Sequence, residues 1–111
     1  MDLSETLKAL ADPNRLRIMN LLGNRTLCVC DLEEILQLNQ SNLSRHLSKL
    51  KQTGLVSAQK RGQFMYYSRQ PQPAPYGPVI DSLLVTMADD PAWENDRREL
   101  NSRLACDEGL C

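Results

Sequence analysis

Two short apolar stripes with helical spacing, separated by a brief polar break, constrain the fold of this chain more than any other feature of its sequence. The first stripe is Leu32, Ile35 and Leu36, and the second is Leu43, Leu47 and Leu50. The break is Asn39-Gln40-Ser41-Asn42. This pattern predicts a helix over residues 30–38 and a second helix that starts at a cap, Asn39 or Ser41, and reaches about Thr53 before Gly54. Two helices joined by so short a turn, the second polar and basic on its outer face, form a helix-turn-helix.

A basic hairpin is predicted directly after these two helices. Residues 55–59 and 64–68 are β-prone runs, and they flank the turn Lys60-Arg61-Gly62-Gln63. A helix, a short turn, a basic helix and then a basic hairpin make a winged arrangement. We therefore expect a mainly α fold with a small β-hairpin, in which a winged helix-turn-helix lies between Pro13 and Ser68.

Further helices are predicted on both sides of this unit. Residues 3–11 carry leucines at helical spacing, and Asp12 with Pro13 is typical of the start of a second helix, which Gly23 ends. Asp31 with Glu34 is a candidate capping pair for the helix at residues 30–38. The prolines of residues 71–78 indicate a connector, residues 79–87 carry an apolar helical stripe, and residues 92–104 form a final charged stretch. We expect a single domain: residues 1–70 hold the winged helix-turn-helix and an N-terminal dimer helix, and residues 71–111 hold the connector, a C-terminal dimerisation helix and a thiol tail.

Charge is strongly segregated along the chain, although the net charge is only −1. No acidic residue lies between Glu34 and Asp81, and the six basic residues there give +6, while the other 7 basic and 14 acidic residues give −7. A solvated polar face gives the same kind of bias. A long stretch without any acid, however, favours contact with a polyanion, and the phosphates of nucleic acid supply one.

The outer positions of the second helix and the hairpin tip are the candidate contacts to double-stranded DNA. A helix in the major groove needs donors and acceptors on its first turns to meet base edges, and nearby cations to meet phosphates. The candidates on the helix are Gln40, Ser41, Asn42, Ser44, Arg45, His46 and Lys49. Those at the hairpin tip are Lys60, Arg61 and Gln63.

Four cysteines give the chain a second kind of candidate site. Cys28 and Cys30 stand at the start of the first helix of the helix-turn-helix, where free backbone N–H groups favour a thiolate. Soft thiolates suit arsenite, antimonite, Cd²⁺, Pb²⁺ or Zn²⁺. A disulfide between cysteines this close closes a tight ring, so we expect metal(loid) capture rather than oxidation of this pair. Cys106 and Cys111 are the remaining thiols, and they are read either as further ligands or as incidental tail thiols.

Several motifs together resemble the ArsR/SmtB family of metal-responsive repressors. They are LADPNRLRIM at residues 10–19, SNLSRHLSKL at residues 41–50 and GLV at residues 54–56, followed by Arg61-Gly62 and Tyr66-Tyr67. The resemblance runs from about Thr6 to Ser68. It implies a homodimer built through the first and last helices, which binds an imperfect inverted repeat in operator DNA and leaves it when an inducer binds.

The same resemblance assigns inducer thiolates to Cys28 and Cys30. The arsenic-sensing pattern places another cysteine one helical turn further on, where this chain has Glu33. Cys106 or Cys111 is then expected to complete a three-sulfur site, from the same subunit or across the dimer. Arsenite or antimonite is the expected inducer of a metalloid-resistance operon, with Cd, Pb or Zn as the alternative.

Other classes of function are less compatible with the sequence. No run of about 18 apolar residues suggests a membrane span, and the start of the chain is acidic, so a cytoplasmic protein is expected. No Cys-x-x-Cys, Ser/His/Asp or paired-carboxylate arrangement indicates an enzyme. A redox or persulfide sensor, in which Cys106 or Cys111 pairs with another thiol, stays open as an alternative.

Overall fold

Helix α2 (Pro13–Leu22) lies at the centre of the computed structural model, which describes residues 2–73 and 75–107. Its start is capped by Asp12, whose Oδ1 accepts hydrogen bonds from the backbone N–H groups of Asn14 (2.9 Å) and Arg15 (3.1 Å). At its end Gly23 adopts a φ of 47° and donates its N–H to the carbonyl of Met19. Both predicted ends of this helix are confirmed.

The helix-turn-helix consists of α3 (Val29–Leu36) and α4 (Gln40–Gln52). Gln37 takes a left-handed conformation in the turn, with a φ of 56°. Asn39 is the cap of α4, because its Oδ1 accepts from the N–H of Asn42 at 2.8 Å. After α4 the chain reverses at Gly54, whose φ is 75°. The predicted mainly α, winged helix-turn-helix fold is confirmed.

The wing belongs to a three-stranded antiparallel sheet. Strands β2 (Val56–Arg61) and β3 (Phe64–Arg69) form the predicted hairpin, with Arg61 opposite Phe64 at its tip. A third strand, β1 (Thr26–Cys28), pairs with the other edge of β3, so that the order is β1-β3-β2. Sequence reasoning missed β1, because three residues are too few to display the alternation that marks a strand.

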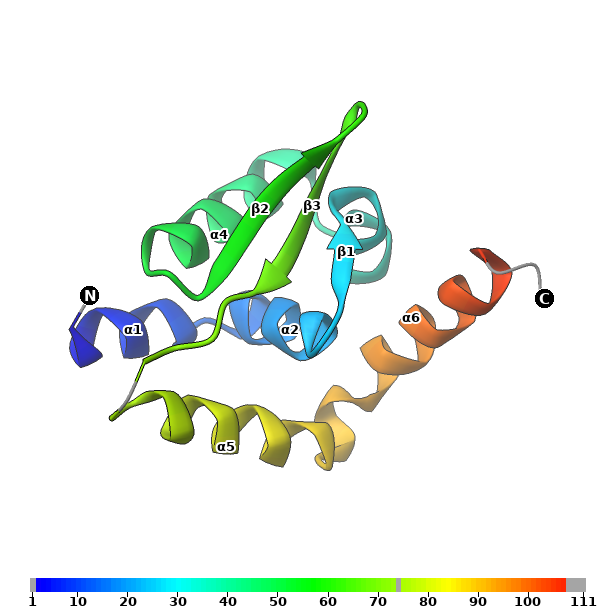
Figure 1. Cartoon of the computed structure of the whole chain (residues 1–111). Helices are drawn as coiled ribbons and strands as arrows, with labels where there is room; N and C mark the ends of the chain where they lie inside the picture. The colour runs from blue at the N-terminus through cyan, green and yellow to red at the C-terminus, as the bar shows by residue number, and fades with distance from the viewer. Residues whose placement is uncertain (1, 74, 108–111) are drawn as a thin grey trace.

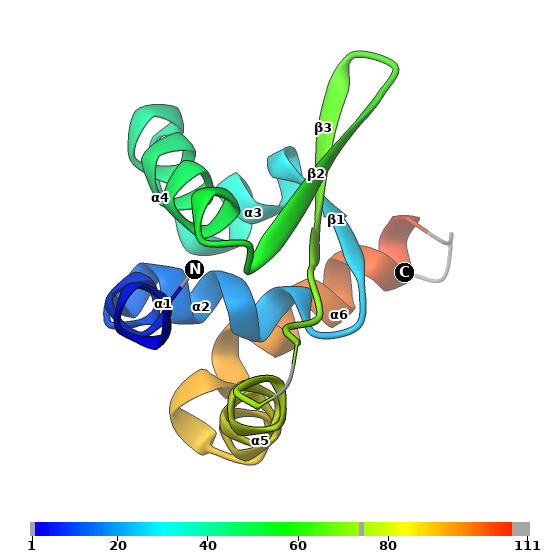
Figure 2. The ribbon, with the colours of Figure 1, turned by 60° about the vertical axis from the view of Figure 1, so that its left-hand side comes forward.

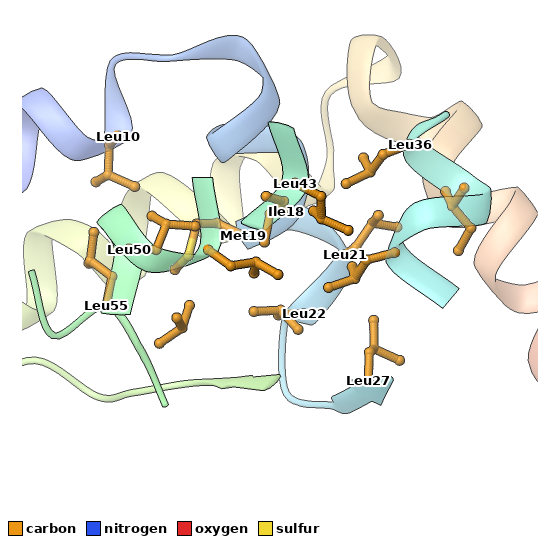
Figure 3. Packing of buried hydrophobic residues seen from close by; sticks show 14 of the residues in the cluster. Leu10, Ile18, Met19, Leu21, Leu22, Leu27, Leu36, Leu43, Leu50 and Leu55 are labelled. Atoms are coloured by element: carbon orange, nitrogen blue, oxygen red, sulfur yellow. The ribbon is translucent and has the colours of Figure 1, made fainter. Parts of the chain in front are cut away.

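The core is built around α2. Ile18, Met19, Leu21 and Leu22 have no exposed surface. Figure 3 shows these four side chains in the middle of the cluster, with Leu50 and Leu55 towards one end and Leu27 and Leu36 towards the other. The apolar stripes of α3 and α4 are buried against α2. Burial of this kind stabilises by roughly 25 cal/mol for each Å² of apolar surface removed from water, and it fixes the position of α4.

Three helices complete the chain. Helix α1 (Leu3–Leu10) precedes α2, while α5 (Gly77–Ala88) and α6 (Glu94–Asp107) follow the sheet, joined by a 3₁₀ turn at Pro91–Trp93. Pro78, expected in the connector, instead lies in the first turn of α5, where its missing N–H costs no hydrogen bond. Figures 1 and 2 show α4 and the hairpin tip projecting from one side of α2, and α5 on the opposite side. None of the helices described is long and apolar enough to cross a membrane.

Candidate nucleic-acid interface and thiol pair

The outer face of α4 is a continuous polar and basic stripe. Gln40, Ser41, Ser44 and Arg45 are exposed, as their predicted role requires. Ser48 is exposed as well and follows Ser44 and Arg45 at the spacing that places residues on one helix face. Sequence reasoning omitted Ser48, although its spacing from Ser44 was a sufficient signal.

The other three predicted DNA contacts on α4 are half-buried and lie at the edge of this stripe. They are Asn42, His46 and Lys49. Nδ1 of His46 lies 3.9 Å from Oδ1 of Asp12, the residue that caps α2. Asn42 accepts a hydrogen bond from the guanidinium of Arg45, one turn further along the helix. His46 is thus held near the start of α2, and Asn42 is joined to the exposed Arg45.

The wing presents its cations at a tight two-residue turn. Gly62, the first residue of that turn, has a φ of 62°, which a hairpin turn of type II′ reserves for glycine. Lys60, Arg61 and Gln63 are exposed around it. The guanidinium carbon of Arg61 lies 4.9 Å from the centroid of the Tyr66 ring, within the range of a cation–π contact.

Phe64 is a further exposed residue of the wing that sequence reasoning did not select. Its side chain is 52% exposed at the start of β3, opposite Arg61. The sequence analysis places it in the β-prone run of residues 64–68, and alternation alone does not show which end of a hairpin projects beyond the core.

The stripe on α4 and the tip of the wing project on the same side of the molecule in Figure 2. Both lie within residues 35–80, which contain six basic and no acidic residues. The fold therefore places Arg45 of α4 and Lys60 and Arg61 of the wing on one side of the molecule, while Arg69 lies at the other end of β3 and pairs with Asp81. We call this surface the basic face; it consists of the exposed residues of α4 and residues 60–63 of the wing.

Cys28 occupies two structural roles at once. It is the last residue of β1, paired with Tyr66 of β3, and it is also the N-cap of α3. Its Sγ accepts a hydrogen bond from the backbone N–H of Cys30 at 3.3 Å. Cys28 is 4% exposed and Cys30 is half-buried. The predicted placement of both thiols at the start of α3 is confirmed.

Two details at this position differ from the sequence-based expectations. Asp31 and Glu34 do not cap α3, because the helix begins at Val29 and Cys28 takes the capping position. The structure also joins Cys28 and Cys30 in a disulfide. The sequence analysis predicts metal(loid) capture instead, because a disulfide between cysteines this close closes a tight ring. The extended backbone of Cys28 followed by the first helical turn at Cys30 brings their Cα atoms to 5.2 Å, within the ordinary range for such a bond.

Helix α6 packs on α2 and α3 of its own chain through arginine–carboxylate pairs. Arg17 of α2 donates to both carboxylate oxygens of Asp96, at 2.8 and 3.1 Å, and this hydrogen bonding raises the pKa of the Arg17 guanidinium. Arg103 of α6 donates to Oδ1 of Asp31, at 2.8 Å from Nη2, and to Oε2 of Glu34 at 3.3 Å. These contacts hold α6 against α3, and Asp31 is the residue that directly follows Cys30.

Among the side chains that the structure describes, those of residues 2–73 and 75–104, no group of three or more His, Cys, Asp or Glu lies close enough to hold an ion. Glu33 is half-buried on α3. Cys106 lies within α6, whereas the predicted ligand Cys111 lies outside the described residues. Two sulfur donors at the start of α3, once reduced, suit a thiophilic metal(loid).

An apolar surface without a partner lies on α1 and α5, away from the basic face. Leu7 of α1 is 48% exposed, and Val79 and Leu83 of α5 are 59% and 39% exposed. Leu3 and Thr6 of α1 line a cleft together with Tyr76 and Ile80, at the start of α5. We call this the α1/α5 face.

A separate polar cleft of about 500 Å³ lies between the end of β3, the turn after α2, and α5. Arg69 and Asp81 form an ion pair at its wall, and burial lowers the pKa of Arg69. None of the predicted site residues lines this cleft.

Comparison with known proteins is consistent with this geometry. Residues 12–58 match the model of a family described as "Bacterial regulatory protein, arsR family". The arsenic resistance transcriptional regulator ArsR1 of Pseudomonas putida is 35% identical over 74% of this chain and 62% of its own length. The arsenical resistance operon repressor of Escherichia coli is 42% identical over 67% of this chain and 65% of its own length. A cadmium resistance regulator, the CadC homolog of Staphylococcus aureus, is 38% identical over 61% of this chain and 57% of its own. The chain thus spans about three-fifths of these relatives.

Solved structures show the same fold. Reduced HlyU from Vibrio cholerae matches with a TM-score of 0.67 and 32% identity, over 78% of this chain and 88% of that one. The homodimeric winged helix-turn-helix DNA-binding domain Mb0332 from Mycobacterium bovis matches with a TM-score of 0.62 and 28% identity, over 77% of this chain and 73% of that one.

Proposed function

This chain belongs to the ArsR family of bacterial regulatory proteins, and on that premise we propose that it is a DNA-binding transcriptional repressor that leaves its operator when its thiols capture an inducer. The observation that carries the proposal is the position of Cys28, which caps the helix that leads directly into α4. The favoured inducer is arsenite or antimonite, and the regulated genes are those of a metalloid-resistance operon.

The basic face is the proposed DNA-binding surface. The exposed side chains near the start of α4 would enter the major groove and read base edges, with Arg45 the strongest donor among them. Lys60 and Arg61 of the wing would contact the flanking phosphates or the minor groove. These contacts are expected to make the affinity fall steeply with salt, because each phosphate that is neutralised releases a counterion.

We propose that two copies of the chain assemble through the α1/α5 face. This surface carries exposed apolar side chains and lies opposite the basic face, so a partner there leaves α4 free. A two-fold dimer presents two recognition helices to half-sites about one turn of DNA apart, which fits an imperfect inverted repeat. Helix α6, by contrast, packs on its own chain, so we assign the seam to α5 rather than to the last helix.

Inducer capture would act on the geometry of α3. Cys28 and Cys30 bind the metal(loid) as thiolates, with one of the C-terminal thiols as a third ligand, and this draws the pair away from the arrangement in which Cys28 caps α3. Because α3 supports α4, the change disfavours DNA binding. Linkage then requires the inducer to bind the DNA-free form more tightly by the same factor by which it weakens DNA affinity.

The deciding experiment titrates the purified, reduced protein, bound to its own upstream DNA, with arsenite, Cd²⁺, Pb²⁺ and Zn²⁺. Fluorescence anisotropy of the labelled DNA measures release. We expect arsenite to release the DNA at the lowest concentration. Cys28→Ser and Cys30→Ser variants are expected to bind the operator and to resist release, since each removes one sulfur ligand.

The matched control is Arg98→Gln, an exposed position of α6 that pairs with Glu94 of the same helix and lies outside the basic face and the α1/α5 face. This variant should be released like the unmodified protein. Normal release of both cysteine variants by arsenite would remove the pair from the mechanism. Release by Cd²⁺ or Zn²⁺ but not by arsenite would assign a different inducer to the same fold.

A thiol redox sensor is the second candidate function, and the Cys28–Cys30 disulfide is the observation that favours it. In this case oxidation itself, rather than metal capture, would change operator affinity. Anisotropy measured with a peroxide-oxidised and a dithiothreitol-reduced sample separates the two candidates, and mass spectrometry identifies which thiols are bridged. Equal affinity of the two samples would rule the redox function out.

A further inference from the structure

Phe64 stands apart from the other exposed apolar side chains of the protein. Among the described residues, the remaining large apolar side chains that are exposed lie on α1, on α5 or at the N-cap of α5: Leu7, Tyr76, Val79, Leu83 and Val85. These belong to the two helices assigned to the dimer seam. Phe64, 52% exposed, lies instead at the start of β3, beside the tip of the wing. A partner on α1 and α5 therefore leaves its ring exposed.

The register of the hairpin places Phe64 on the face of the wing that is turned away from the core. Arg61 is directly opposite Phe64, and Gln59 is opposite Tyr66. Side chains of opposed residues, and of residues two apart on a strand, lie on the same face of a sheet. Tyr67, whose side chain packs against the core, lies on the other face. Phe64 and its three neighbours therefore share the outer face at the end of the hairpin.

The arginine opposite Phe64 is held by other partners. The guanidinium carbon of Arg61 lies 4.9 Å from the ring centroid of Tyr66, and Nη2 donates to Oε1 of Gln59 at 3.1 Å. Both partners belong to the next cross-strand pair on that face, further from the turn. Arg61 is thus held beside Tyr66, and the ring of Phe64 stays exposed nearer the tip.

The surroundings of this ring favour nucleic acid as its partner. Lys60 and Arg61 are exposed beside it, and no acidic residue lies within residues 35–80. Figures 1 and 2 show the hairpin tip projecting beyond the body of the protein, on the side of α2 that carries α4. A duplex that holds α4 in its major groove can present the adjacent minor groove to such a tip. Phosphates line the edges of that groove and base edges form its floor, so an apolar ring among cations fits it.

We propose that Phe64 is an apolar wedge that enters the minor groove beside each half-site and partly opens one base step. This inference rests on the proposed function and specifies how the wing contributes to the choice of operator. Apolar side chains that insert between base steps unstack them and bend the duplex towards the major groove. This deformation is easiest at the flexible pyrimidine–purine steps TA and CA/TG. The wing therefore selects operators by the deformability of the flanking DNA.

Two tasks are then divided between neighbouring residues of the wing. Lys60 and Arg61 supply positive charge, which attracts phosphates of any sequence. The ring of Phe64 carries no charge, so its loss should leave the salt dependence of binding unchanged. It acts through the sequence of the step that it opens. The two contributions can therefore be measured separately.

The first test locates the opened step. Footprinting of the reduced full chain on its own upstream DNA defines the half-sites, and 2-aminopurine is then placed at one flanking position at a time. This base fluoresces more strongly when it is unstacked. We expect its fluorescence to rise at one step beside each half-site with the unmodified protein and with Phe64→Leu, which keeps an apolar wedge. With Phe64→Gln, a polar side chain of similar length, the rise should be lost. An equal rise with Phe64→Gln would overturn the proposal.

The second test measures selection between flanking sequences. Anisotropy titrations compare two duplexes with the same half-sites, one with TA at the located step and one with GG. The unmodified protein should bind the TA duplex roughly tenfold more tightly, an effect of the size of one unfavourable base pair in a site. Phe64→Gln should bind both duplexes equally. Arg61→Ala is the matched variant, because it should lose affinity for both duplexes and keep their ratio. An unchanged ratio in Phe64→Gln would contradict the wedge.

Failure of the proposed function has a different signature from failure of this inference. If the unmodified protein binds its upstream DNA no better than unrelated DNA, the proposed function fails and the wedge fails with it. If it prefers its upstream DNA but unstacks no flanking base, only the role of Phe64 fails. Sedimentation velocity of Phe64→Gln adds one more outcome, because a monomeric variant would assign the ring to the contact between copies and overturn the proposal.

Discussion

Arg61 and Arg45 are the two arginines of the basic face, and the protein orders both of them before any DNA is bound. Arg61 stacks over Tyr66 and donates to Oε1 of Gln59 at 3.1 Å, while Arg45 donates to Asn42. An arginine that is already ordered loses less side-chain entropy when it meets a phosphate or a base. The hairpin and the helix thus present pre-arranged cations.

We predict that Arg61→Ala weakens binding to operator and to unrelated DNA by similar factors. A wing contact to phosphate carries no sequence information, so the loss should be uniform. The slope of log affinity against log salt should decrease by about 0.9, the value expected for one phosphate contact. Anisotropy titrations at four salt concentrations measure both quantities.

Arg98→Gln is the control for this prediction, because it removes one exposed positive charge from α6, outside the basic face and the α1/α5 face. Its salt slope should equal that of the unmodified protein. A loss confined to operator DNA in Arg61→Ala would show that the wing reads bases instead of phosphates.

At the scale of elements, α6 is held by ion pairs more than by an apolar stripe. Asp96 is the most buried carboxylate at this contact, and it accepts two hydrogen bonds from Arg17. Asp96→Asn is expected to lower the free energy of unfolding by about 1–3 kcal/mol, the usual contribution of hydrogen bonds to a charged group. Urea denaturation followed by circular dichroism measures this change.

Arg98→Gln serves as the comparison, because its pair with Glu94 is exposed and such pairs contribute little. Its unfolding free energy should remain within about 0.5 kcal/mol of the unmodified protein. Equal stabilities for the two variants would mean that the Arg17–Asp96 pair does not hold α6.

Elements with a local signal were predictable from the sequence. Asp12 with Pro13 marked the start of α2, and the apolar stripes of α3 and α4 gave the helix-turn-helix, because capping and periodicity are encoded within a few residues. The hairpin was predicted from its β-prone runs around Gly62. Once these elements were assigned, the candidate DNA contacts on α4 and at the tip of the wing could be predicted as well.

Features that depend on contacts between distant residues were not predictable in the same way. Strand β1 forms because Thr26–Cys28 pairs with the edge of β3 at Tyr66 to Ser68, which lie far along the chain. The sequence predicts Cys28 near the start of a helix. Its role as the N-cap was not predictable, because the sequence does not show at which residue α3 begins. The pairing of Arg103 with Asp31 joins residues 72 apart, and no local pattern reports it.

At the scale of the whole molecule, the protein separates the basic face from the exposed apolar side chains of α5. The basic face lies on one side of α2 and α5 lies on the other, with α1 beside α2. This separation lets a dimer form without covering α4. A substitution on α5 can therefore change the assembly of the protein while every residue of the basic face stays the same.

We predict that Leu83→Glu shifts the protein from dimer to monomer, because it places a charge in the exposed apolar stripe of α5. Sedimentation velocity measures the change in mass. Operator affinity should fall strongly, since two half-sites are no longer bound together. Asn95→Glu adds the same charge at an exposed position of α6 and should remain dimeric. A dimeric Leu83→Glu would place the seam elsewhere.

A chemical change at Cys28 affects two elements directly, because this residue is both the end of β1 and the N-cap of α3. This residue ends the strand that pairs with Tyr66, the ring on which Arg61 rests, and it begins the helix that precedes α4. Cys28 is therefore joined to the hairpin by the pairing of β1 with β3, and to the helix-turn-helix by the start of α3.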